Sequence, residues 1–142
     1  MNKALSDREG ISNFFVNNET FNSGTAGLGH SHNRYEFAIG VQTYTGDSLV
    51  RFKKCKPPQL IQIDVEGFEI EVLKGLKNTL QKYHPTILFE HSLYRLKERN
   101  EQKNKVTKFL ESLGYSIYNQ LNNKKLAKND LNSDTDFIAK FN

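Results

Sequence analysis

The segment LIQIDVEGFEIEVLKG, residues 60–75, constrains the fold of this chain more than any other stretch. It begins with a short apolar run, continues through two acids, and turns at Gly67 into a pattern that places apolar residues on one helical face. A second apolar run, from Thr86 to Phe89, follows this helix. A strand, a helix and a strand in this order predict a parallel βαβ unit of an α/β fold.

Four polar side chains stand at the ends of these two predicted strands: Asp64, Glu66, Glu90 and His91. The carboxyl ends of parallel strands meet at the same edge of a sheet, which is where ligands bind in folds of this kind. We therefore expect these four side chains to converge on one acceptor, and they are the candidate catalytic residues.

The first 59 residues predict an antiparallel β region with a long polar loop. Strands are predicted at residues 11–16 and 35–45, the second because apolar and polar residues alternate from Phe37 to Thr43. Residues 17–34 between them are rich in Asn, Ser and Gly, which predicts a loop. Two prolines then separate this region from the first parallel strand.

Further elements follow the same reasoning. The helix of the βαβ unit is predicted to run unbroken to His84, where the following proline ends it. Another helix is predicted to begin near Asn100 and to end at Gly114. The last two predicted strands cover residues 115–118 and 136–141, joined by a turn-rich polar segment.

Composition limits the classes of protein to consider. A length of 142 residues predicts one domain, and the net charge of +4 is too evenly spread to predict nucleic-acid binding. The single cysteine, Cys55, excludes an internal disulfide and any multi-cysteine metal site. No apolar run approaches the roughly 20 residues of a membrane span, and no signal-peptide pattern follows Met1. We therefore expect a soluble, cytoplasmic protein that binds neither nucleic acid nor membrane.

The two strands and their helix resemble the second half of the FkbM-type methyltransferases. That family carries I/L-D-V-E-G after an apolar strand, then E-x-x-V-L-x-G and, after a polar stretch, P-x-I-L-x-E. The matching residues here are Ile63, Asp64, Val65, Glu66 and Gly67, then Glu69, Val72, Leu73 and Gly75, and finally Pro85, Ile87, Leu88 and Glu90. Ala4 to Asp7, followed by Gly10, is similar to the family's segment after its third sheet strand.

The resemblance covers most of the chain and implies both a fold and an activity. The implied fold is a Rossmann-like class I methyltransferase sheet in a single, partial domain over residues 1–142, with the antiparallel β region as an addition. The implied cofactor is S-adenosylmethionine. The implied reaction is methylation of a hydroxyl on a sugar, a polysaccharide or another natural product, so the partner is a small-molecule or glycan acceptor.

The family's first strand, its acidic glycine-rich loop and the acid of its second strand would precede Ala4, where only three residues stand. We therefore expect a sheet truncated at the N-terminus, and we assign no cofactor-binding residue. The glycines of GTAGLG, residues 24–29, do not follow the G-x-G-x-x-G spacing and predict a mobile loop. The strand at residues 61–65 would then form an exposed sheet edge, which predicts self-association or an upstream partner chain.

The acids suit the chemistry that the resemblance implies. A carboxylate or histidine beside an acceptor hydroxyl removes its proton as the new bond forms. We expect Asp64 to be this base, with Glu66 and Glu90 shaping the acceptor pocket. Structural roles stay open: Glu66 as a partner of the glycine turn or the helix N-terminus, and Glu90 as an ion-pair partner of Arg95 or Lys97.

Other interpretations remain beside this one. His91 is also open to a role as a hydrogen-bonded cap. The sequence D-V-E is similar to the acidic motif of metal-dependent glycosyltransferases, but the helix that follows at once favours the methyltransferase. His30 and His32 supply only half of a metal site, so no metal is predicted. The main competing function is non-catalytic: a remnant, or a partner module that completes a sheet with another chain.

Overall fold

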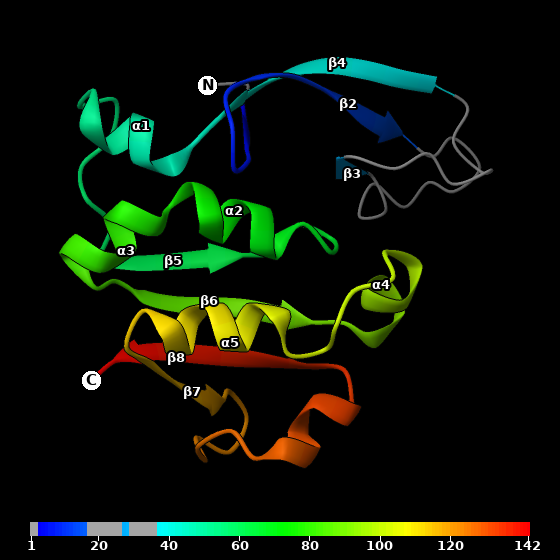
Figure 1. Cartoon of the computed structure of the whole chain (residues 1–142), viewed down its shortest axis with the longest axis vertical. Coiled ribbons are helices and arrows are strands. Elements are labelled where there is room, and N and C mark those ends of the chain that lie inside the picture. The colour runs from blue at the N-terminus through cyan, green and yellow to red at the C-terminus, as the bar shows by residue number, and fades with distance from the viewer. Residues whose placement is uncertain (1–2, 17–26, 29–36) are drawn as a thin grey trace.

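The computed structural model describes residues 3–16, 27–28 and 37–142, whose strands form two four-stranded sheets (Figure 1). The first sheet has the order β1-β4-β2-β3. Its strands are β1 (Ala4–Leu5), β4 (Phe37–Tyr44), β2 (Gly10–Val16) and β3 (Gly27–Leu28). β1 runs parallel to β4, and β2 runs antiparallel to both β4 and β3. The predicted antiparallel pair is confirmed over the described residues, as β2 and β4.

The polar segment 17–34 is predicted as a loop throughout, which is wrong for Gly27 and Leu28. These two residues pair with β2, Leu28 opposite Phe14 and Gly27 opposite Phe15. β4 occupies one side of β2, and β3 pairs with part of the other side, so backbone groups that would be free at that edge find partners. Most of this segment, the rest of the GTAGLG motif included, lies outside the described residues.

The prediction of β structure up to residue 59 is also wrong, because α1 (Gly46–Arg51) is a helix. Thr45 has an extended backbone, and its side-chain oxygen accepts a hydrogen bond from the Ser48 backbone N–H at 3.1 Å. Asp47 adds a negative charge to the first turn, where the helix dipole favours it. This capping pattern is local, so the start of α1 could have been predicted from the sequence.

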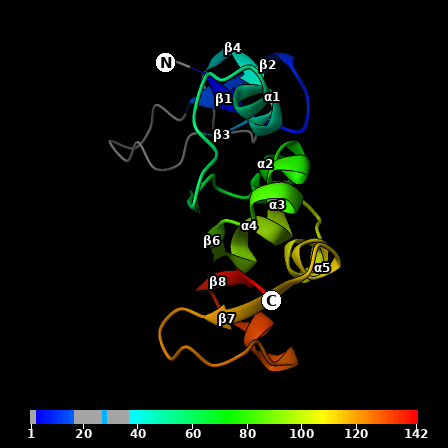
Figure 2. The same cartoon turned by 90° about the vertical axis from the view of Figure 1, so that its left-hand side faces the viewer.

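The second sheet contains the predicted βαβ unit. It has the order β5-β6-β8-β7, with strands β5 (Leu60–Ile63), β6 (Thr86–His91), β8 (Thr135–Phe141) and β7 (Tyr115–Asn119). β5 and β6 are parallel, and β8 runs antiparallel to both β6 and β7. The helices of this half lie on one face of the sheet (Figure 2). The α/β class is therefore confirmed, as a mixed arrangement with two sheets.

The helix between β5 and β6 is predicted as one piece, and the structure corrects this to two, α2 (Glu69–Gly75) and α3 (Lys77–Tyr83). The helical geometry is interrupted at Leu76, which ends α2 and precedes α3. Gly75 lies directly against the backbone just after β1, because a Cβ atom added there would overlap the carbonyl oxygen of Ser6. This close approach requires glycine at the end of α2.

A carboxylate from α1 starts the second of these helices. Asp47 accepts hydrogen bonds from the backbone N–H groups of Asn78 at 3.0 Å and Thr79 at 2.7 Å. These are N–H groups of the first helical turn, which have no partner inside the helix. As predicted, α3 ends before Pro85, and His84 takes the left-handed conformation with φ 50°. The break therefore depends on a tertiary contact that sequence periodicity does not contain.

Two helices follow β6, and a short 3-10 helix precedes β8: α4 (Leu93–Glu98), α5 (Lys105–Ser112) and η2 (Lys128–Asn132). The sequence pattern did not indicate α4, and α5 begins at Lys105 instead of near residue 100 as predicted. The Leu93 backbone N–H donates to the carboxylate of Asp134 at 2.6 Å, so α4 is also capped from a distant part of the chain.

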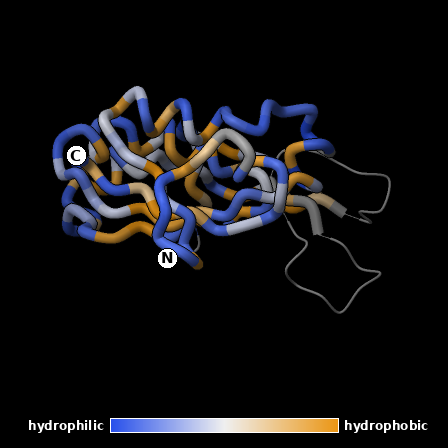
Figure 3. Tube along the Cα trace, turned by 90° about the horizontal axis from the view of Figure 1, so that it is seen from below, coloured by the Kyte–Doolittle hydropathy of each residue, from blue (hydrophilic) through white to orange (hydrophobic). Residues whose placement is uncertain are grey.

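The main core lies between the second sheet and its helices. Its buried side chains are Ile63, Val72, Leu73, Leu76, Leu80, Ile87, Phe89, Leu110, Tyr115, Ile117, Phe137 and Ala139. Figure 3 shows apolar stretches running through the interior of the trace and hydrophilic ones along much of its outside. Within the described residues β5 is an edge strand, and Leu60 at its start is 59% exposed. Among these residues no helix is long and apolar enough to cross a lipid bilayer.

Candidate active site

The turn after β5 holds the acidic motif in an uncommon backbone conformation. Glu66 and Gly67 both have positive φ, 53° and 92°. The turn is closed by a hydrogen bond from the Phe68 backbone N–H to the Val65 carbonyl oxygen at 3.2 Å. Glycine adopts such angles freely, but for glutamate they carry strain of a kind that concentrates at functional sites. The strained residue here is one of the predicted site acids.

A buried hydrogen bond joins this turn to α2. The backbone N–H of Gly67 donates to Oε1 of Glu69 at 2.9 Å. Burial raises the pKa of Glu69, against the opposing effects of backbone hydrogen bonds and of Arg99. Glu69 is only 7% exposed, so its carboxylate has a structural role and is not accessible to a ligand.

Two arginines pack on the same turn from α4 and its C-terminal end. Nε of Arg95 lies 2.7 Å from Oε2 of Glu66. The guanidinium of Arg99 lies 5.0 Å from the ring centroid of Phe68. A Cβ atom added at Gly67 would lie 3.0 Å from Cδ of Arg99 and 3.1 Å from Cβ of Arg95, so a side chain here would crowd both arginines. The turn is thus held between α2 and α4.

Glu90 lies on β6 at the same edge of the sheet, opposite Asp136 of β8. Burial raises the pKa of Glu90 above its ordinary value, and so do neighbouring negative charges. These charges belong to Glu66, Asp64, Glu69 and Asp136. A carboxylate in such surroundings binds a proton more tightly than an exposed glutamate does, which makes it a stronger base.

Three of the four predicted site residues therefore gather at the carboxyl ends of β5 and β6. Asp64 is exposed directly after β5, Glu66 is tied to Arg95, and Glu90 is half-buried. We call Asp64, Glu66 and Glu90 the acid cluster. Its members are close enough to act on the charge of one another, and it lies at the sheet edge that the parallel β5–β6 pairing predicts.

His91 does not join the acid cluster. Successive residues of a strand point to opposite faces, and burial alternates along β6 so that His91 lies on the buried face with Phe89. Its Nε2 lies 3.2 Å from the Leu131 carbonyl oxygen, and its ring centroid is 5.8 Å from that of Phe137. Burial lowers the pKa of His91. The expectation that all four side chains converge is therefore corrected for His91, whose contacts match the capping role.

The described part of the chain shows no candidate metal site. No set of three or more His, Cys, Asp or Glu side chains there is placed to hold an ion. The predicted histidine pair, His30 and His32, lies outside the described residues.

Sequence reasoning missed one residue of this edge, Asp136, and gave another, Arg95, a different partner. Asp136 reaches it only because β8 returns antiparallel beside β6, and no local pattern shows that register. Arg95 was predicted from the sequence as a possible partner of Glu90, whereas the structure pairs it with Glu66. The helix α4 was not predicted, and its position determines the direction of the Arg95 side chain.

Comparison with known proteins identifies the family of the chain. The methyltransferase FkbM domain model matches residues 2–117. The hexuronic acid methyltransferase AglP of Haloferax volcanii is 39% identical over 57 residues, a match that covers 40% of this chain and 24% of that protein. The chain thus spans about a quarter of the length of this relative. No solved structure matches the chain. Since the family model covers most of the sequence, the chain belongs to the FkbM methyltransferase domain family.

Proposed function

We propose that this chain takes part in methyl transfer from S-adenosylmethionine to an oxygen atom of a sugar, a polysaccharide or another natural product. The observation that carries the proposal is the state of Glu90, a half-buried carboxylate whose pKa is raised by burial and by the other acids of the site. Such a group is a base in the right place, at the carboxyl ends of two parallel strands. Membership of a methyltransferase family supplies the reaction class.

The negative charge of the acid cluster suits this methyl donor. S-adenosylmethionine carries a positive sulfonium and a ribose with two hydroxyl groups, and the acid cluster presents negative carboxylates that attract the first and accept hydrogen bonds from the second. When bound, the cofactor supplies an activated methyl group. Asp64, which is exposed, is the acid best placed to contact it from the turn after β5.

Glu90 has the chemical role of proton acceptor in this proposal. The Glu90 carboxylate would take the proton of the acceptor hydroxyl as the hydroxyl oxygen bonds to the methyl carbon, so that no free alkoxide is needed. The bond from that carbon to the sulfonium sulfur would break at the same time, and the cofactor would leave as a neutral thioether. This revises the expectation that Asp64 is the first choice of base. The reason is burial, because Glu90 is partly withdrawn from water whereas Asp64 is exposed. Arg95 holds Glu66 and thereby fixes the turn that carries Asp64.

The carbohydrate acceptor follows from two supports. The family resemblance implies sugars and polysaccharides among its acceptors, and the relative AglP is named for a sugar acid, hexuronic acid. We extend the proposal to a Rossmann-like class I methyltransferase sheet. Its support is the parallel β5–β6 pair with an added antiparallel strand, an arrangement common in sheets of that type. A cytoplasmic location stays a prediction.

A second candidate function is that of a partner module, and the position of β5 favours it. β5 is an edge strand within the described residues, and an exposed edge offers backbone groups to a strand from another chain. Either a second copy or an upstream polypeptide would complete this sheet. Light scattering at high protein concentration tests this: association supports it, and a stable monomer counts against it.

The direct test of the proposed function is calorimetric titration of the whole chain with S-adenosylmethionine. Saturable one-to-one binding supports methyl transfer at the acid cluster. The Asp64→Asn variant is expected to bind more weakly, and Glu111→Gln, an exposed change on α5, serves as its control. Absence of binding by the wild-type chain contradicts the proposal for this chain and favours the partner module.

A further inference from the structure

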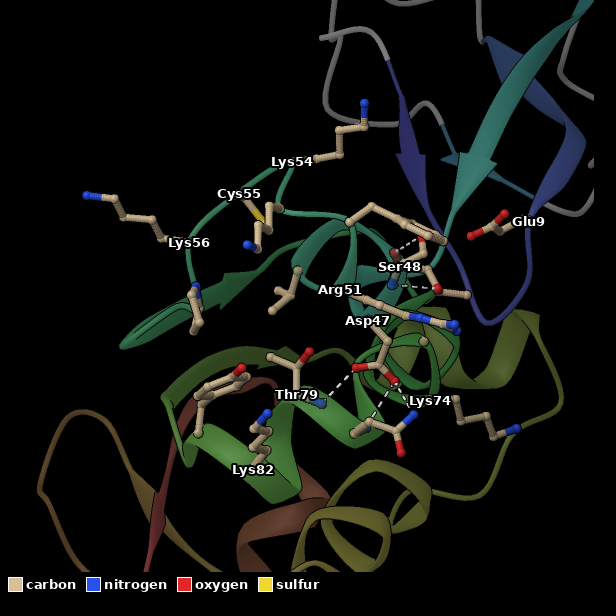
Figure 4. Close-up of a pocket in the computed structure, with 18 of the residues that line it drawn as sticks. Glu9, Asp47, Ser48, Arg51, Lys54, Cys55, Lys56, Lys74, Thr79 and Lys82 are labelled. Carbon is tan, nitrogen blue, oxygen red and sulfur yellow. Dashed lines mark hydrogen bonds between the residues drawn. The ribbon is translucent and has the colours of Figure 1, made fainter.

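A cavity of about 1370 Å³ lies between α1, the segment 52–57 and the helices α2 and α3 (Figure 4). It is larger than the roughly 300–1,000 Å³ that is usual for the pocket of a small ligand. The cavity lies at the amino-terminal end of β5, because segment 52–57 leads into that strand. The acid cluster follows its other end, about 13 Å away along four residues at about 3.3 Å each. The cavity is therefore separate from the candidate active site.

Positive charge dominates the lining of this cavity. Its six basic residues are Arg51, Lys53, Lys54, Lys56, Lys74 and Lys82, against the three acids Asp7, Glu9 and Asp47. We call the six the basic rim. Within the described part of the chain none of them forms an ion pair. A concentration of unpaired cations around one hollow attracts anions and is costly in self-repulsion without them.

The three acids of the lining cancel only half of the charge of the six cations. Asp47 is committed to the start of α3 through Asn78 and Thr79. Asp7 accepts a hydrogen bond from the Ser6 hydroxyl at 3.1 Å and lies 4.0 Å from Arg8. The field over the cavity is therefore positive, whereas the field over the acid cluster is negative. Positive charge thus concentrates at the amino-terminal end of β5 and negative charge at its carboxyl end.

The shape of the basic rim indicates which kind of anion it suits. Figure 4 shows Arg51 and Lys82 near the space between α1 and α3, while Lys54, Lys56 and Lys74 extend outward around it. Five of the six cations are lysines, which are flexible point charges and lack the fixed fork with which arginine grips a single phosphate. Such an arrangement suits a long, flexible ligand with several separate negative groups. A flat membrane surface would not enter a concave site.

From this charge and shape we infer that the cavity binds an acidic oligosaccharide through its carboxylates. The choice of a carbohydrate rests on the proposed function, since a polysaccharide, one of the acceptors proposed there, would extend over the about 13 Å between the two ends of β5. Its anionic units would be held at the basic rim and kept away from the acid cluster, where like charges repel them. The basic rim thereby selects acceptors with negative groups at a distance from the methylated oxygen.

Binding of a fluorescent oligogalacturonate to the whole chain, read by anisotropy without any methyl donor, tests this inference. The double variant Lys54→Glu/Lys56→Glu is expected to weaken binding on the order of tenfold. The control is Lys124→Glu/Lys125→Glu, which makes the same charge change on an exposed segment outside the cavity. It is expected to weaken binding less than about twofold. Circular dichroism verifies that both variants fold.

Three results of the binding assay would overturn the inference. One is equal weakening by the two double variants, which would mean that only the net charge matters. Another is no binding of oligogalacturonate in low salt. The third is tighter binding of single-stranded DNA or of phosphatidylglycerol vesicles that depends on Lys54 and Lys56, which would assign the site to another partner. Because no methyl donor is present, failure of methyl transfer leaves this test unaffected. Conversely, the Lys54→Glu/Lys56→Glu variant could transfer methyl groups to acidic acceptors at the wild-type rate. That result would support the proposed function and overturn only this inference.

Discussion

Nε of Arg95 lies 2.7 Å from Oε2 of Glu66, so that the turn after β5 is fastened to α4. The two side chains are mostly withdrawn from solvent, 17% and 30% exposed. The pair joins an acid in a strained backbone conformation to a helix 29 residues away in sequence. Rigidity at the acid cluster is therefore imposed by a tertiary contact as well as by the turn itself.

Replacing Arg95 should loosen this attachment. Arg95→Ala leaves the Glu66 carboxylate partly buried without its partner, and we expect a loss of about 1–2 kcal/mol in the free energy of unfolding. Urea denaturation measures the loss. Arg8→Ala, at a side chain 82% exposed, is the control and should change stability little. Equal effects of the two substitutions would show that the contact with Glu66 contributes nothing.

A side chain at Gly67 should destabilise the protein. Gly67→Ala places a Cβ atom at φ 92° and within 3.0–3.1 Å of the side chains of Arg99 and Arg95. We expect a loss of about 1–3 kcal/mol in the free energy of unfolding. Gly40→Ala is the matched control, because a Cβ atom there meets only Ile11 at 3.5 Å, an ordinary contact. A Gly67 variant as stable as the Gly40 variant would contradict the described packing of the turn.

The sequence predicted the βαβ unit because its signals are local: an apolar run, an acid–glycine turn and a helical stripe. It failed for α4, which is capped by Asp134 from another element, and for the break at Leu76, which depends on Asp47 and Ser6. The acid cluster was predictable from the strand ends. Burial alternates along β6, so a core position for Phe89 implies that His91 also faces the core and lies outside the acid cluster. This could have been predicted from the sequence.

Glu90 should lower stability at neutral pH. Its raised pKa means that the folded state holds the proton more tightly than the unfolded state, so stability falls as pH rises from about 4.5 through the raised value. Glu90→Gln removes this titration and should be more stable than the wild-type chain at neutral pH. Denaturation at several pH values checks this. A difference that stays constant with pH would contradict the raised pKa.

His91 should act in the opposite direction. Burial lowers its pKa from the ordinary 6.5, so the unfolded chain takes up a proton that the folded chain resists, and stability falls as pH drops below that value. His91→Phe removes the titration, and its stability relative to the wild-type chain should rise on acidification. Because His91 lies away from the acid cluster, the variant should keep its methyl transfer. Loss of transfer in a folded His91→Phe protein would return His91 to the active site.

The most direct test of the central claim, that the acid cluster is the site of methyl transfer, is a rate measurement on Glu90→Gln. Transfer of labelled methyl groups from S-adenosylmethionine to a glycan acceptor would be followed with the whole chain. General-base catalysis is worth about 10²–10⁴-fold, so we predict a loss of at least about 10²-fold for Glu90→Gln and a normal rate for the exposed control Glu111→Gln. A Glu90→Gln protein that transfers methyl groups at the wild-type rate would contradict the account.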